Sequence, residues 1–141
     1  MKTITKIILM LLAAMMLCGT LAACADVEKT GAWEDATYTA DKEFGKGAKS
    51  VTVLVTAEEQ SLTFTLHTDK KTLGEALLEH GLIEGEEGAF GLYVKKVNGI
   101  LADYNVDQTY WNFTKGGELM MVGVDGAEIA DGEQYELTKT K

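Results

Sequence analysis

The chain has 141 residues, 22 of them acidic and 13 basic, which gives a formal net charge of −9 at pH 7. So acidic a protein lacks the basic face that nucleic acid phosphates require, and nucleic acid is excluded as a partner. Both cysteines, Cys18 and Cys24, lie near the N-terminus. The remainder of the chain therefore has no thiol for a disulfide, a zinc thiolate site or a cysteine nucleophile.

Residues 1–23 have the layout of a secretory signal peptide. A short basic start precedes an uncharged apolar run over residues 7–17, and small residues follow it. The uncharged stretch 7–25 is also just long enough to span a bilayer, so a retained transmembrane helix is the alternative. Because acidic rather than basic residues come next, we expect export and cleavage.

The end of this segment, Leu21-Ala22-Ala23-Cys24, resembles the bacterial lipobox: an apolar residue and two small ones before a cysteine. In that family a diacylglycerol is joined to the cysteine thiol, and the signal is cut in front of it. The resemblance implies that Cys24 is the lipid-bearing first residue of a protein on the extracytoplasmic face of a bacterial cell membrane. Two or three acyl chains on one residue make a durable anchor. The alternative is ordinary secretion with Cys24 unmodified.

Residues 24–49 are predicted to form a flexible tether that carries the lipid. They are mainly Asp, Glu, Lys, Thr, Ala and Gly, with Trp33, Tyr38 and Phe44 as the only large side chains. These three aromatic residues could dock on the domain or have no role. We expect the folded domain over residues 50–141, which is long enough for one modest core.

The predicted domain begins with two strands, over residues 51–55 and 62–66. The second strand alternates apolar residues with threonine, as a strand with one buried face does. Residues 57–61 are expected to form the hairpin loop that joins the two strands. An antiparallel pair is therefore predicted at the start of the domain.

A helix is predicted next. Thr72 can cap its N-terminus, Glu75 three residues later completes a capping box, and Gly81 is a natural stop. The following segment, residues 84–88, contains three carboxylates, which could indicate a calcium site. It lacks the alternating oxygen ligands of an EF-hand loop, so we expect a solvated loop.

Strands fill the rest of the chain. The run 92–97 leads through Asn98-Gly99, the strongest two-residue hairpin signal, into residues 100–102. Further strands are predicted over residues 110–114, 118–122 and 134–138. One amphipathic helix against a mixed sheet is an α+β architecture, and a β-grasp is the best-known fold with this order of elements.

Several short motifs occur in an order and spacing that resemble the transcobalamin-like C-terminal domain, the DUF4430 family. They are Thr72-Leu73-Gly74-Glu75-Ala76-Leu77-Leu78, Gly91-Leu92-Tyr93-Val94, Val97-Asn98-Gly99-Ile100, Tyr110-Trp111-Asn112-Phe113, Gly117-Glu118, Gly123-Val124 and Asp131-Gly132-Glu133. The resemblance covers about residues 50–139. It implies a soluble-ligand-binding β-grasp domain of a type common on bacterial surface lipoproteins.

In the animal members, this domain closes over one face of cobalamin. The resemblance implies ligand contacts at four positions here, Tyr93, Trp111, Asn112 and Val124. A corrin is a broad apolar disc rimmed by amides, which suits an exposed indole face with a few polar partners. The animal proteins hold cobalamin against a large helical barrel, for which this sequence gives no signal, and the family commonly has glutamine where Asn112 stands. A lone domain offers one wall of the site, so much weaker affinity is expected unless a partner supplies the other wall, and Asn112 has a shorter reach than glutamine.

Other functions leave fewer traces in the sequence. Trp111 and Tyr110 face opposite sides of one predicted strand, so one of them is core, and a structural role for Trp111 stays open beside a ligand-binding one. His67 and His80 form no metal-ligand cluster, and nothing pairs a nucleophile with a base, so neither a metal site nor an enzyme is expected.

The expected function is a lipid-anchored binding module for a small ligand, with cobalamin or another corrinoid as the leading example. The alternative is a protein-interaction or surface-assembly module.

Overall fold

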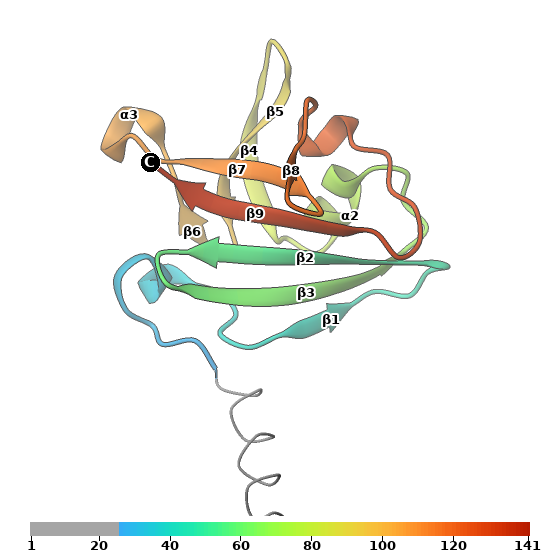
Figure 1. The fold of residues 1–141 in the computed structure, drawn as a ribbon, viewed down its shortest axis with the longest axis horizontal. Helices are drawn as coiled ribbons and strands as arrows, with labels where there is room; N and C mark the ends of the chain where they lie inside the picture. Colours follow the sequence, from blue (N-terminus) through green and yellow to red (C-terminus); the bar gives the residue numbers. More distant parts are fainter. Residues whose placement is uncertain (1–25) are drawn as a thin grey trace, which may run out of the picture.

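The computed structural model describes residues 26–141 as two sheets with short helices (Figure 1). The larger sheet contains β1 (Lys42–Phe44), β2 (Lys49–Ala57), β3 (Gln60–Thr68), β7 (Tyr110–Lys115), β8 (Glu118–Leu119) and β9 (Gln134–Thr140); the smaller contains β4 (Ile83–Gly88), β5 (Gly91–Val97) and β6 (Ile100–Leu101). The helices are α2 (Leu73–Glu79) and α3 (Tyr104–Asp107), and the 3-10 turns are η2 (Gly31–Asp35) and η3 (Val124–Gly126).

The predicted signal peptide and Cys24 lie outside the described residues. Within residues 26–141, no helix has the length and apolarity to cross a membrane.

The six-stranded sheet has the order β1-β3-β2-β9-β7-β8. Its two central strands, β2 and β9, are parallel, while β3 pairs with β2 and β7 with β9 in antiparallel fashion. Two hairpin-type pairs around a parallel centre are the arrangement of a β-grasp. The α+β prediction is therefore confirmed, and the sheet is mixed as expected.

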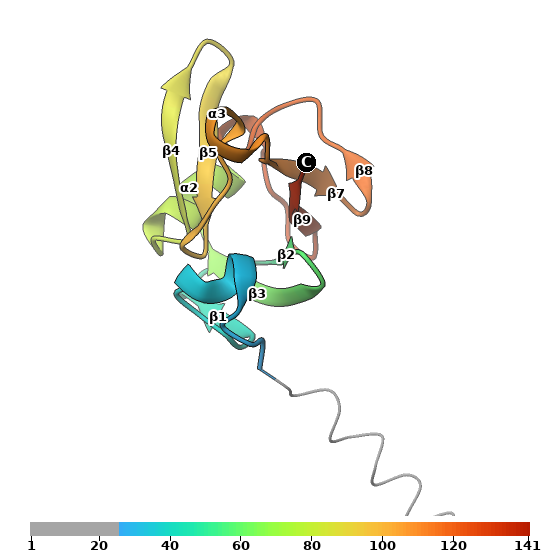
Figure 2. The ribbon, with the colours of Figure 1, turned by 90° about the vertical axis from the view of Figure 1, so that its left-hand side faces the viewer.

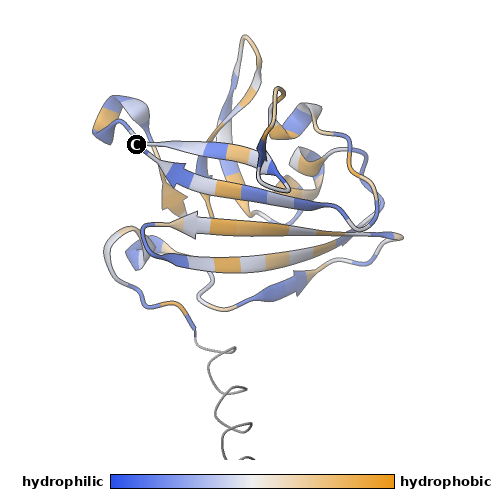
Figure 3. Ribbon diagram, viewed as in Figure 1, coloured by the Kyte–Doolittle hydropathy of each residue, from blue (hydrophilic) through white to orange (hydrophobic). Residues whose placement is uncertain are grey.

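The core lies on the face of this sheet that alternate residues of β2 and β3 supply. Val51, Val53 and Val55 are fully buried, and so are Phe64 and Leu66. Figure 3 shows the apolar stretch along β2, and Figure 2 shows the small sheet and α2 standing together beside the larger sheet. The alternation read from the sequence thus identified the buried face.

Helix α2 begins at the predicted capping box. The Thr72 hydroxyl accepts from the Glu75 main-chain N–H at 3.3 Å, and the Glu75 carboxylate accepts from the Thr72 main-chain N–H at 3.4 Å. The helix lies directly on η3, because a Cβ added at Gly74 would come within 2.9 Å of the Cα of Asp125. Only glycine allows this close approach of two backbones.

The hairpin turn predicted at Asn98-Gly99 is confirmed. Both residues have positive φ angles, 53° and 79°, as a type I′ turn requires. The Asn98 side chain is almost fully buried; it donates to the Tyr38 carbonyl at 2.9 Å and accepts from the Tyr38 N–H at 2.8 Å. The turn therefore also fixes a segment sixty residues earlier in the chain.

The solvated loop expected over residues 84–88 is wrong. This segment belongs to β4, which pairs with β5 in antiparallel fashion with a bulge at Glu84/Gly85. After Ile83 every residue of β4 is exposed, so no apolar alternation marks the strand. Pairing with β5 holds it instead, together with ion pairs from Glu84 to Lys96 at 3.4 Å and from Glu86 to Lys95 at 3.1 Å.

The flexible tether predicted over residues 24–49 is also wrong for its described part, residues 26–49. The Trp33 side chain is fully buried, and its indole N–H donates to the Ala57 carbonyl at 2.9 Å. Strand β1 extends the sheet by pairing in parallel with β3. The fold therefore includes residues well before position 50.

Aromatic contacts explain why a largely polar segment packs so firmly. The rings of Tyr38, Phe44 and Phe64 meet edge to face, with centroids 5.4 to 5.9 Å apart. Such pairs contribute about 0.5–1.5 kcal/mol beyond the area that they bury. Tyr38 and Phe44 thus help to dock this segment on Phe64 of β3.

Candidate functional site

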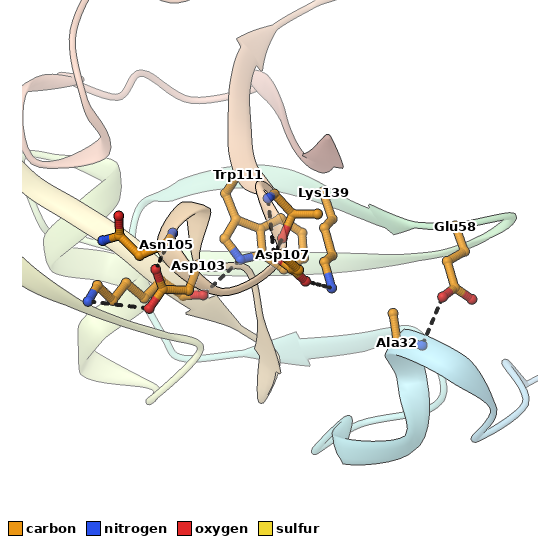
Figure 4. A network of polar contacts seen from close by, with 9 residues as sticks. Ala32, Glu58, Asp103, Asn105, Asp107, Trp111 and Lys139 are labelled. Carbon is orange, nitrogen blue, oxygen red and sulfur yellow. Dashed lines mark hydrogen bonds and ion pairs between the residues drawn. The ribbon is translucent and has the colours of Figure 1, made fainter. Parts of the chain in front are cut away.

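Strand β5 is held in place by two contacts from distant parts of the chain. The Trp111 indole N–H donates to the Lys95 carbonyl at 3.1 Å, and the Asp125 carboxylate accepts from the Leu92 main-chain N–H at 3.0 Å. Figure 4 shows the first contact, with the Trp111 ring on β7. Tyr93 lies between the two contacts along β5 and is 43% exposed. These two hydrogen bonds fix the position of β5 and of the side chains, such as Tyr93, that reach solvent from it.

Trp111 itself is core. Its side chain is 8% exposed, whereas the adjacent Tyr110 is 38% exposed. One of the two had to be buried, and the structure identifies it. The expectation that the indole is displayed outward to cover a ligand is therefore wrong. The ring packs between the sheets, and its N–H donates to the main chain of β5.

Of the other two predicted contact residues, one is buried and one is half-buried. The Val124 side chain, in η3, is 2% exposed and has no free surface for a ligand. Asn112 is half-buried on β7, in register with Thr138 of β9. Of the four predicted positions, Tyr93 alone presents a large exposed ring, and the structure does not gather the four around one hollow.

The motif residues are instead brought together as a structural junction at Asp125. Gly91 has φ +102°, and a Cβ there would lie 2.6 Å from the Asp125 carboxylate. Gly74 touches the Asp125 backbone, as described above. The helix motif, the glycine-tyrosine motif and the segment after Gly123 thus meet at one residue.

A hollow of about 400 Å³ lies beside this junction. It is lined by Phe90, Met121, Val122, Gly123, Asp125 and Gly126. Phe90, in the turn between β4 and β5, is 101% exposed, and Met121 is 91% exposed. Half of the Val122 side chain is exposed as well. We call Phe90, Met121 and Val122 the Phe90 patch.

Sequence reasoning missed this patch. Phe90 lies in the turn Gly88-Ala89-Phe90-Gly91, where the small residues around it cannot bury its ring. This was the sequence feature that could have indicated an exposed aromatic residue. Exposed apolar side chains that cluster beside a hollow mark interaction sites more often than isolated ones do. Methionine adds an adaptable contact surface.

Lys95 of β5 lies in a small cluster of charged side chains. Lys95 forms ion pairs with Glu86 at 3.1 Å and Asp103 at 3.7 Å. The hydrogen bond to Glu86, with the charge of both carboxylates, raises the pKa of Lys95 above its usual range. The ammonium group therefore stays charged and engaged with the hairpin.

A related polar network surrounds α3 (Figure 4). The Asp103 carboxylate caps the helix by accepting from the Asn105 N–H at 3.0 Å. Asp107 accepts hydrogen bonds from Thr109 and lies 3.8 Å from the Lys139 ammonium. These contacts, the Thr109 hydroxyl first, hold the pKa of Asp107 below its ordinary value of 3.8.

Each histidine lies beside one carboxylate. His67 lies 3.7 Å from Glu43, and His80 lies 3.8 Å from Glu79 with its ring against Phe44. Among residues 26–141, no three His, Cys, Asp or Glu side chains form a group that could hold a metal ion.

The family described as "Domain of unknown function (DUF4430)" matches residues 70–140. The crystal structure of a candidate metal-binding protein from Ruminococcus gnavus ATCC 29149 is similar at 36% sequence identity, with a TM-score of 0.64, over 67% of this chain and 98% of that protein. No curated protein matches the chain.

A more distant similarity joins the chain to haptocorrin in complex with cobinamide. The two structures have a TM-score of 0.51 and 24% sequence identity over 70% of this chain. The matching part is 26% of haptocorrin, so this chain corresponds to about a quarter of that protein. At this level of identity the similarity shows a shared fold.

Proposed function

Since the chain belongs to the DUF4430 family of domains of unknown function, we propose that it is a non-catalytic, lipid-anchored binding module for a small flat ligand, with a corrinoid as the first candidate. The observation that carries the proposal is the Phe90 patch beside a hollow of about 400 Å³. Hollows of about 300–1,000 Å³ with apolar walls and a few polar groups are typical of small-molecule sites.

The arrangement of the patch suits a broad, mostly apolar molecule with a polar rim. Phe90 and Met121 offer apolar surface, while Gly123 and Gly126 leave main chain rather than side chains along the hollow. The Asp125 carboxylate supplies a polar edge. Asp125 and Trp111 bond to the main chain of Leu92 and Lys95, on both sides of Tyr93. Strand β5 is therefore ordered before a ligand arrives, which lowers the entropic cost of binding.

The fold shared with haptocorrin, which was crystallised with cobinamide, supports a corrinoid as the first ligand to test. The similarity to a candidate metal-binding protein raises a metal ion as a different ligand. The described residues offer no cluster of three ligands for it, so the metal is an alternative outcome of the test rather than the proposal. A protein partner would favour a flat apolar surface, and the hollow favours a small molecule.

Lipidation of Cys24 is the second part of the proposal. It rests on the lipobox-like sequence Leu21-Ala22-Ala23-Cys24 and places the domain on the extracytoplasmic face of a bacterial membrane. Mass spectrometry of the protein purified from bacterial membranes would identify the acylated N-terminal peptide. The variant Cys24→Ala should lose the acyl mass and retain residues 1–23, which the same measurement detects.

The ligand is tested by calorimetric titration of the membrane-purified protein, in nanodiscs, with cobinamide, with cobalamin and, separately, with zinc chloride. We expect binding that Phe90→Ser weakens about tenfold or more, because burial of a phenylalanine ring contributes about 1.5–3 kcal/mol. The matched control is Tyr104→Ser, which removes another exposed aromatic ring, on α3. Absence of heat up to high micromolar corrinoid, an equal effect of both variants, or heat only with zinc chloride would each refute corrinoid binding at the patch.

A further inference from the structure

The first described residues are fixed to one end of the domain. The Val27 N–H donates to the Thr39 carbonyl at 2.7 Å, and the Val27 side chain packs against the core. Glu28 forms two hydrogen bonds with the Gln60 side chain, at 2.7 and 3.0 Å, next to the turn between β2 and β3. The folded domain therefore begins no later than residue 27.

This leaves very little chain between the fold and the proposed anchor. Val27 is three residues from Cys24, and three residues span at most about 11 Å even when fully extended. The polar headgroup layer of one leaflet is itself about 5–8 Å thick. A lipid on Cys24 would therefore hold Val27 at the surface of the headgroups.

We propose that the end of the domain formed by Asp26–Lys29 and the Glu58-Glu59 turn rests on the lipid headgroup layer. The Phe90 patch then faces away from the membrane. The inference rests on the proposed lipidation of Cys24 but not on ligand binding. In both ribbon views, the turn between β4 and β5 lies at the end of the molecule opposite the start of the described chain (Figures 1 and 2). The short connection thus gives the domain an orientation that a long tether would not.

The chemistry of this end shows that the covalent link, rather than charge, must hold it down. Its exposed charged residues are Asp26, Glu28, Glu58 and Glu59, against Lys29. Anionic headgroups repel such a surface within a Debye length of about 10 Å at 0.1 M salt. A zwitterionic headgroup layer is therefore the surface that this end fits.

The orientation can be measured by energy transfer from a dye on the protein to acceptor-labelled lipids. Acylation of Cys24 and loss of Cys18 with the signal leave no thiol, so a single introduced cysteine can be labelled. The acylated full-length product, purified from bacterial membranes, is reconstituted into phosphatidylcholine vesicles after labelling at Glu59→Cys or at Ala89→Cys. Because a domain of this size is on the order of 35 Å across, transfer from position 59 should be about twofold or more higher than from position 89.

The matched control inserts a flexible Gly-Ser linker of about 12 residues, with an end-to-end distance of about 19 Å, between Ala25 and Asp26. The difference between the two dye positions should then largely disappear. Equal transfer without the linker, or higher transfer from position 89, would overturn the orientation. So would a mass spectrum that shows Cys24 unmodified. The corrinoid titration is independent of all these outcomes, so failure of the orientation and failure of ligand binding remain distinguishable.

Discussion

The Trp111 indole N–H donates to the main-chain oxygen of Lys95 at 3.1 Å, and this bond joins the six-stranded sheet to the three-stranded one. The family resemblance implied that this ring contacts a ligand, whereas in the structure it links the two sheets. It orders β5, the strand that leads from the Phe90 turn through Tyr93. The residue acts on the candidate site through the position of this strand.

Replacing Trp111 should therefore destabilise the fold. Trp111→Ala is expected to lower the free energy of unfolding by about 3–5 kcal/mol, as loss of a large buried side chain does. Trp111→Phe keeps most of the packing but removes the indole hydrogen bond to the Lys95 carbonyl, which still accepts from the Ala102 N–H at 2.8 Å, so a smaller loss of about 0.5–1.5 kcal/mol is expected. Urea unfolding followed by circular dichroism measures both. A Trp111→Ala protein of unchanged stability would show that the ring is not core.

Trp33 tests whether residues 26–49 belong to the folded domain. Its ring is fully buried and bonded to Ala57, so Trp33→Ala should cost about 3–5 kcal/mol of unfolding free energy. The neighbouring exposed residue provides the control: Glu34→Ala should change stability by less than about 0.5 kcal/mol. The same urea experiment applies. Equal midpoints for the two variants would restore the tether interpretation.

The acid side of the stability profile should depend on Asp107. Its pKa is lower in the folded protein, so the contribution of the carboxylate to stability is present above its unfolded value of 3.8 and is lost as pH falls through the folded pKa. The Thr109 hydroxyl is the largest cause, and Thr109→Val should move the pKa of Asp107 upward. Carboxyl titration by NMR measures it directly. An Asp107 pKa unaffected by Thr109→Val would contradict the assignment.

What the sequence determined alone is what a few consecutive residues can specify. The capping box at Thr72 and Glu75 needs one helical turn, and the Asn98-Gly99 turn needs two residues with positive φ. The alternation in residues 62–66 defines a buried face within one strand. Each of these patterns is local, so each was predicted correctly, and together they were sufficient to indicate an α+β fold.

What only the tertiary structure decided depends on partners far along the chain. Trp33 is buried in the core with its N–H bonded to the carbonyl of Ala57, 24 residues later, and no local pattern marks this contact. Residues 84–88 form a strand because β5 supplies the hydrogen bonds, although both faces of β4 are exposed. Trp111 became core and Phe90 became surface for the same reason: burial is decided by which other elements pack against a side chain, and that information is spread over the whole fold.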